Sequence, residues 1–199
     1  MKTENVVLMQ MARESLKGKW GLAIGTFVVY LLISVVLQMI TIVGPIASLI
    51  ISGPFALGLA VFGLSISRNQ DAKLEQIFQG FSNFGTALGA YLLIILFFLL
   101  WMILLIIPGI IAAISYSMTF YILADDNSIG AMDAIDKSKK MMDGYKWKYF
   151  CLCLRFLGWA LLCILTLGIG LLWLMPYMQV TMAKFYDDVK ANSLTTENI

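Results

Sequence analysis

Three long stretches of this chain carry no formal charge, and they leave few ways for it to fold. They run from Trp20 to Ser67, from Gln76 to Ala124 and from Phe156 to Ala183. Each is longer than the roughly 20 apolar residues that cross the hydrocarbon core of a bilayer. The 199 residues are 60% hydrophobic and 13% charged, whereas soluble domains are about half apolar and a quarter charged. The sequence therefore predicts an integral membrane protein that crosses the bilayer several times.

Glycine and proline divide each charge-free stretch into two helices. Residues 86–124 would form a helix about 58 Å long, nearly twice the roughly 30 Å hydrocarbon core, so we expect a reversal at Pro108-Gly109. Gly44-Pro45 and the Gly168-to-Gly170 turn are the corresponding breaks in the other stretches. The predicted helices are 20–42, 46–66, 86–107, 109–124, 149–167 and 171–186. This predicts an all-α transmembrane bundle of six spans in three hairpins.

Basic residues predict which side of the membrane each connection occupies. Of the 14 Lys and Arg residues, all but Arg155 lie at or beyond the same ends of the predicted hairpins. Because basic residues near membrane ends mark the cytoplasmic side, we expect both termini and both long connections in the cytoplasm. The protein should then be a multi-pass protein of a cytoplasmic (inner) membrane.

Similar residues recur at nearly equal intervals along the chain. The recurring positions are Gly18, Gly80 and Gly144; Pro54, Ser115 and Pro176; and the pairs Asp125-Asp126 and Asp187-Asp188. We expect one unit, an amphipathic helix followed by a hairpin, to be used three times in a single domain. The units would cover about 5–67, 70–126 and 128–189, with a short tail at 190–199, and two crossings per unit would make them parallel. Regular spacing that arises without repetition is the alternative.

A short amphipathic segment precedes each predicted hairpin. The apolar positions are Leu8, Met9, Ala12 and Leu16 in the first segment, Leu74, Ile77, Phe78 and Phe81 in the second, and Ile129, Met132, Ile135 and Met142 in the third. Asn127 or Ser128 would cap the third helix. We expect these helices at the cytoplasmic side, either in the headgroup plane or packed against each other.

Several segments resemble one known family. Residues 12–24 (ARESLKGKWGLAI), 77–88 (IFQGFSNFGTAL) and 133–189, with their Gly-Ile-Gly turn, Pro-Tyr pair and Phe-Tyr-Asp-Asp end, resemble the domain-of-unknown-function 975 family. The resemblance implies a bacterial integral membrane protein of no established activity. The chain is also similar to the membrane portion attached to some glycerophosphodiester phosphodiesterases, but their catalytic domain is absent from it. Arg155 departs from the small or uncharged residue that the resemblance implies.

Arg155 is the sharpest candidate for a functional residue. It follows Lys148 by two helical turns, which places it about 10 Å into the membrane, and a charge at such depth indicates function by default. It could hold an anionic lipid headgroup or pair with a carboxylate. Alternatively, its stem lies in lipid and its guanidinium reaches the cytoplasmic interface.

Other polar groups near the membrane are candidates for the same kind of site. The possible ligand or lipid-headgroup residues are Arg155, Gln179, Tyr177, Tyr116, Asp125, Asp126, Asp187 and Asp188. The paired aspartates could gather a divalent cation, or simply end one helix and cap the next segment. Gln179 could line a cavity or bond across helices, and the tyrosines could line a polar interior or the core.

The sequence offers little for catalysis. It has no histidine, which excludes Ser-His-Asp and Cys-His sets, and Cys151 and Cys153 point to different sides of a helix. We expect no enzyme, cofactor, metal or nucleic-acid site. The favoured hypothesis is a non-enzymatic membrane module that binds anionic lipid headgroups or an unidentified membrane or cytoplasmic protein at its cytoplasmic face, for example in an immunity role. The alternative is a small transporter or lipid-handling protein with a cleft between the hairpins.

Overall fold

The computed structural model describes residues 3–39, 44–166 and 168–197, and all regular elements within these ranges are helical. They are α1 (Asn5–Ser15), α2 (Trp20–Gln38), α3 (Gly44–Ser67), the 3-10 helix η1 (Leu74–Phe81), α4 (Phe84–Leu104), α5 (Ile106–Tyr116), α6 (Thr119–Asp125), α7 (Ala131–Met141), α8 (Lys146–Ile164) and α9 (Leu171–Glu197). The predicted all-α fold is confirmed.

Five segments of the described chain are long and apolar enough to cross a membrane: α2, α3, α4, α5 together with α6, and α8. The predicted sixth span, in α9, is not among them, since Lys184, Asp187 and Asp188 interrupt its apolar run. The number of six spans therefore stays a prediction.

The helix boundaries differ from the predicted ones in three places. The chain reverses at Leu105, whose backbone is extended, and Pro108 lies in the first turn of α5. A proline is tolerated there because first-turn amides have no intrahelical partner, so the prediction of a break at Pro108 was wrong. The span after it is interrupted at Ser117, between α5 and α6. The last helix was predicted to end at residue 186, but α9 continues to Glu197. Residues 40–42 and 167 of the predicted helices lie outside the described residues.

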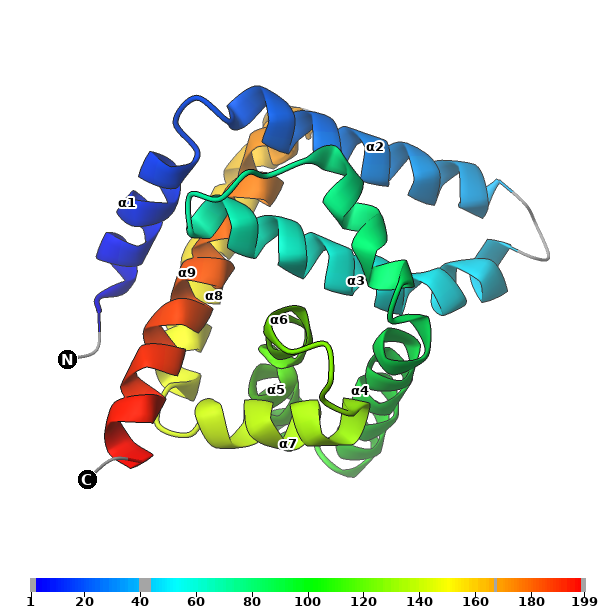
Figure 1. Ribbon diagram of the computed structural model, residues 1–199, viewed down its shortest axis with the longest axis vertical. Helices are drawn as coiled ribbons and strands as arrows, with labels where there is room; N and C mark the ends of the chain where they lie inside the picture. The colour runs from blue at the N-terminus through cyan, green and yellow to red at the C-terminus, as the bar shows by residue number, and fades with distance from the viewer. Residues whose placement is uncertain (1–2, 40–43, 167, 198–199) are drawn as a thin grey trace.

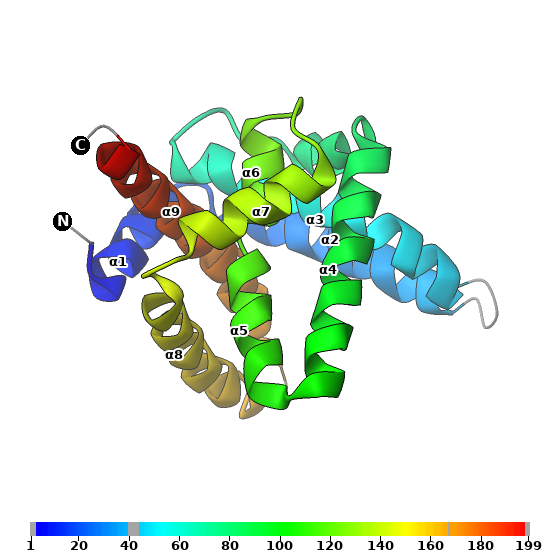
Figure 2. The ribbon, with the colours of Figure 1, turned by 90° about the horizontal axis from the view of Figure 1, so that it is seen from below.

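The second helix of each hairpin lies inside the molecule and the first lies outside. In the apolar 18-residue window of each candidate span, 61% of the residues are buried in α3 and 50% in the α5–α6 segment, against 17% in α2 and 11% each in α4 and α8. Figure 1 shows α6 near the centre, framed by α3, α4, α7 and α9, and Figure 2 shows the α4–α5 hairpin and α8 pointing away from α2 and α3. The hairpins thus diverge from a shared base and do not form a bundle of parallel rods.

Each of the three short helices that precede a hairpin packs on the second, inner helix of another hairpin. The pairs are α1 with α9, η1 with α3, and α7 with α6. The η1–α3 contact is the closest, because a Cβ added at Gly58 would lie 1.9 Å from the Ile77 carbonyl oxygen and one at Gly80 would lie 1.9 Å from that of Pro54. The short helices α1, η1 and α7 therefore pack between one hairpin and the next, where they hold the hairpins apart.

The amphipathic patterns identify most of the buried faces. All four predicted apolar residues of the first segment are buried, as is Ile77 of η1, but the prediction was wrong for Phe78, which is 42% exposed. In the third segment Ile135 and Met142 are buried as predicted, but the prediction was wrong for Met132, which is 47% exposed. Ala134 and Ser138 of α7 face the core as well. The predicted cap was also wrong, because Gly130 occupies the N-cap position of α7.

Candidate functional site

Four charged residues meet where the inner helices of the three hairpins come together, and we call them the polar junction: Arg68, Asp125, Asp187 and Lys190. Arg68 follows α3, Asp125 ends α6, and the other two lie in α9. The Arg68 guanidinium donates to Asp125 Oδ1 at 2.6 Å and to Asp187 Oδ1 at 2.7 Å, and Lys190 Nζ lies 2.5 Å from Asp125 Oδ2. One network of ion pairs therefore joins all three hairpins.

Asp125 is the most enclosed member of the polar junction. Its side chain is 11% exposed, against 32% for Arg68 and 40% for Lys190. It accepts two hydrogen bonds from Arg68, one from Lys190 and one from the Tyr186 hydroxyl at 2.9 Å. The hydrogen bonds to Asp125, and then those to Asp187, raise the pKa of Arg68 above its usual range. The four side chains of the junction are thus paired with one another.

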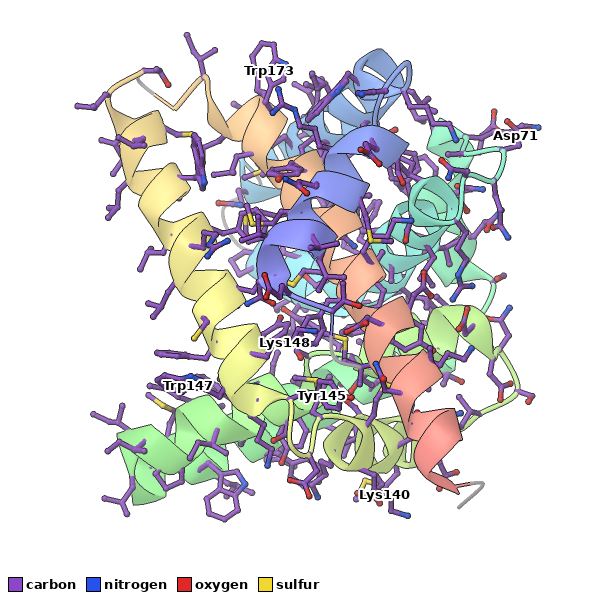
Figure 3. All side chains as sticks on the ribbon, turned by 90° about the vertical axis from the view of Figure 1, so that its left-hand side faces the viewer. Asp71, Lys140, Tyr145, Trp147, Lys148 and Trp173 are labelled. Atoms are coloured by element: carbon purple, nitrogen blue, oxygen red, sulfur yellow. The ribbon has the colours of Figure 1, made fainter. Side chains whose placement is uncertain are left out.

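A second ion pair links α8 to α9. Lys148 Nζ lies 2.7 Å from Asp188 Oδ2, with 14% and 9% of the two side chains exposed, and Thr3 donates to the other carboxylate oxygen. The Lys148 ammonium also lies over the Phe185 ring, 5.2 Å from its centroid. Figure 3 shows Lys148 on the side of α8 that faces α9, while Trp147, which is 74% exposed, points away from it.

The two aspartate pairs do not act as pairs. Asp126 accepts hydrogen bonds from the backbone and hydroxyl groups of Ser128, 3.0 and 2.6 Å away, and these bonds lower the pKa of its carboxyl group. Asp125 and Asp126 therefore serve different structures, as do Asp187 and Asp188. Among the described residues, no three His, Cys, Asp or Glu side chains are grouped so that they could hold a metal ion.

The other polar candidates bond between helices or lie in the core. Gln179 Nε2 donates to the Leu59 carbonyl of α3 at 2.9 Å. Tyr116 is 4% exposed and contacts the Phe97 ring. The Tyr177 hydroxyl donates to the Met9 carbonyl of α1 at 3.1 Å, and its ring meets Phe156 edge-on.

An open groove, which we call the aromatic groove, lies between α1, α2, α8 and α9. Its volume is about 420 Å³, and it is lined by Met9, Arg13, Trp20, Trp159, Cys163, Gly170, Trp173, Leu174 and Tyr177. Arg155 is exposed on α8, one helical turn before Trp159. Arg155 is thus on the outer surface of α8 and not in the core between the hairpins.

The sequence reasoning missed Arg68, Lys190 and Arg13. A signal was present for Arg68: it is the first charge after the first apolar stretch, as Asp125 is after the second. Arg68 and Asp125 each stand at the end of an inner helix, and they meet because these helix ends converge. Arg13 offered no such signal, because its helical position indicates only a solvated face.

Comparison with known proteins identifies the family. No curated protein and no solved structure matches the chain. The family described as "Protein of unknown function (DUF975)" matches residues 1–115 and 97–193, which together include nearly the whole chain. The chain belongs to this family, as its sequence motifs predicted.

Proposed function

We propose that the protein is a non-enzymatic, multi-pass module of a bacterial inner membrane that binds a partner protein at its cytoplasmic face. The observation that carries the proposal is the polar junction. Asp125 and Asp187, which the sequence offered as ligand-binding groups, are paired with Arg68 inside the structure. These charged groups hold the three hairpins together. Such fixed pairing favours a static scaffold, because the polar side chains of a transport pathway must exchange partners.

The outer face of α7 is the best candidate for the binding surface. Lys137, Lys139 and Lys140 are exposed there, next to Asp133 and the 47% exposed Met132. An exposed apolar side chain amid charges of both signs is typical of the core and rim of a protein interface.

The proposal includes six crossings with both termini in the cytoplasm. The clustering of basic residues supports this topology. In a variant without native cysteines, Lys137→Cys should resist a membrane-impermeant thiol reagent added to whole cells, whereas Thr166→Cys, at the α8–α9 turn, should react. Labelling of Lys137→Cys from outside the cell would refute the topology.

We also propose that the chain is a threefold internal repeat closed into a ring. The cyclic packing of α1 on α9, η1 on α3 and α7 on α6 supports this, since each unit would then bind the inner helix of the preceding unit. Gly18 and Gly144 also adopt the same left-handed backbone, with φ of 77° and 72°, at equivalent joints between a short helix and an outer helix.

Affinity purification of the full chain in mild detergent tests the partner proposal. A protein should be recovered in stoichiometric amount with the wild type and be lost from the Lys137→Glu/Lys140→Glu variant. The matched control is Lys73→Glu, which replaces a 62% exposed lysine just before η1 and should retain the partner. Recovery of no protein, or equal recovery with all three chains, would contradict the proposal.

A lipid-handling protein is the second candidate function. The aromatic groove favours it, because its volume of about 420 Å³ lies within the range of small-molecule sites, roughly 300–1,000 Å³.

A further inference from the structure

We propose that the aromatic groove binds one anionic phospholipid, with its phosphate between Arg13 and Arg155 and an acyl chain along the tryptophans. The inference rests on the proposed membrane location but not on the proposed protein partner. It assigns a ligand to a surface away from the polar junction and from the outer face of α7.

Arg13 lines the groove, and Arg155 is exposed on α8 one helical turn before the groove residue Trp159. Within residues 3–39, 44–166 and 168–197, neither Arg13 nor Arg155 pairs with a carboxylate or donates a hydrogen bond to the chain. Both guanidinium groups lie within electrostatic range of the Tyr177 hydroxyl. Of the cations that adjoin the inner helices, Arg68, Lys148 and Lys190 pair with carboxylates and Lys184 donates to the Ser67 carbonyl, whereas the described residues supply Arg13 and Arg155 with no such partner.

The positions of the two arginines follow from helix geometry. Arg155, Trp159 and Cys163 are four residues apart in turn and form one stripe on α8, and the latter two line the groove. Met9 and Arg13 form the corresponding stripe on α1. Tyr177 contacts both helices, through its hydrogen bond to the Met9 carbonyl of α1 and its ring contact with Phe156 of α8. The groove therefore has walls that are held in place without a ligand.

The lining indicates a lipid. Trp159 is 53% and Trp173 is 52% exposed, and Figure 3 shows Trp173 near the turn that joins α8 to α9. Exposed indole rings offer a large apolar surface against which an acyl chain can pack. A guanidinium in apolar surroundings needs an anion, and its planar fork matches the oxygens of a phosphate. An anionic phospholipid supplies both the phosphate and the apolar chain, whereas free phosphate would leave the aromatic surface uncovered.

Lipid titration of the purified full-length protein, followed by native mass spectrometry, tests the proposal. Phosphatidylglycerol should bind with one-to-one stoichiometry and phosphatidylcholine should bind much more weakly. The Arg13→Gln/Arg155→Gln variant should bind phosphatidylglycerol about tenfold more weakly or worse, since each lost charged hydrogen bond weakens binding by this order. The matched control Lys137→Gln/Lys139→Gln, which removes two exposed cations from α7, should bind like the wild type.

Three results would overturn the proposal: equal phosphatidylglycerol binding by both double variants, equal binding of the two lipids by the wild type, or displacement of the lipid by millimolar inorganic phosphate. Trp159→Ala/Trp173→Ala provides a second arm if the arginine variant does not fold. Both tryptophans are half exposed, so this variant should fold and still lose affinity. Unchanged affinity in it would also refute the site. Partner recovery is measured separately, so failure of this site leaves the proposed scaffold function untouched.

Discussion

Replacing Asp125 by Asn tests whether the polar junction holds the three hairpins together. The substitution keeps the shape of the side chain but removes the charge that faces Arg68 and Lys190, with contacts of 2.6 and 2.5 Å. A hydrogen bond to a charged group contributes about 1.5–3 kcal/mol. Since Arg68 is 32% and Lys190 is 40% exposed, solvent screening reduces each contribution toward the lower figure.

We therefore expect Asp125→Asn to lower the free energy of unfolding by about 2 kcal/mol. For a chain of this size that corresponds to a fall of roughly 4–8 °C in melting temperature, measurable by intrinsic fluorescence in a mild detergent. The control is Asp71→Asn. Asp71 is 82% exposed and its one ion pair, with Lys73, is 3.3 Å long, so the melting temperature should change by less than about 2 °C.

A double-mutant cycle with Arg68→Gln separates the ion pair from local damage. If the two side chains act together, the double variant should be little less stable than either single variant, with an interaction energy of about 1 kcal/mol or more. Strict additivity, or an Asp125→Asn effect no larger than that of Asp71→Asn, would refute the role assigned to the junction.

Three further substitutions test particular contacts by the same melting assay. Gly58→Ala should prevent folding or lower stability by more than about 3 kcal/mol, because the new Cβ would overlap the Ile77 carbonyl oxygen; near-wild-type melting would contradict the η1–α3 packing. Gly18→Ala should lower stability by only about 1–2 kcal/mol, since φ is 77° but no atom lies within 4 Å of the added carbon, and a larger loss would mean a hidden contact. Gln179→Leu should lower it by about 0.6–1.7 kcal/mol through loss of the bond to Leu59, and no loss would show that this bond is dispensable.

The sequence predicted where the helices lie and which residues are buried, because both depend on whether a side chain is apolar. Apolar length located the helices, and helical spacing identified Leu8, Ala12 and Leu16 as buried. Details within a helix were harder to predict. Pro108 lies just after the reversal but does not form it, because proline is compatible with a first turn. Met132 is exposed because the buried face of α7 is formed by Ala134, Ile135, Ser138 and Met141.

The sequence did not predict the contacts that the candidate-site residues make between hairpins. Asp125 was recognised as unusual, but its partners Arg68 and Lys190 lie in other hairpins. Sequence periodicity describes one helix at a time and carries no information on which hairpin ends meet. Gln179 was assigned two possible roles, and its bond to Leu59 could be recognised only once α3 and α9 were seen to cross.

An arginine that has a carboxylate partner within the fold differs in its expected role from one that has none, and depth in the membrane alone does not reveal this difference. Arg68 and Arg155 both adjoin apolar helices, but Arg68 has two carboxylates within 2.7 Å, whereas Arg155 has no carboxylate partner among the described residues. A guanidinium that remains ionised in apolar surroundings requires an anion from some source. The fold supplies that anion for Arg68. For Arg155 the described residues supply none, and this difference is why we propose that it binds the phosphate of a lipid.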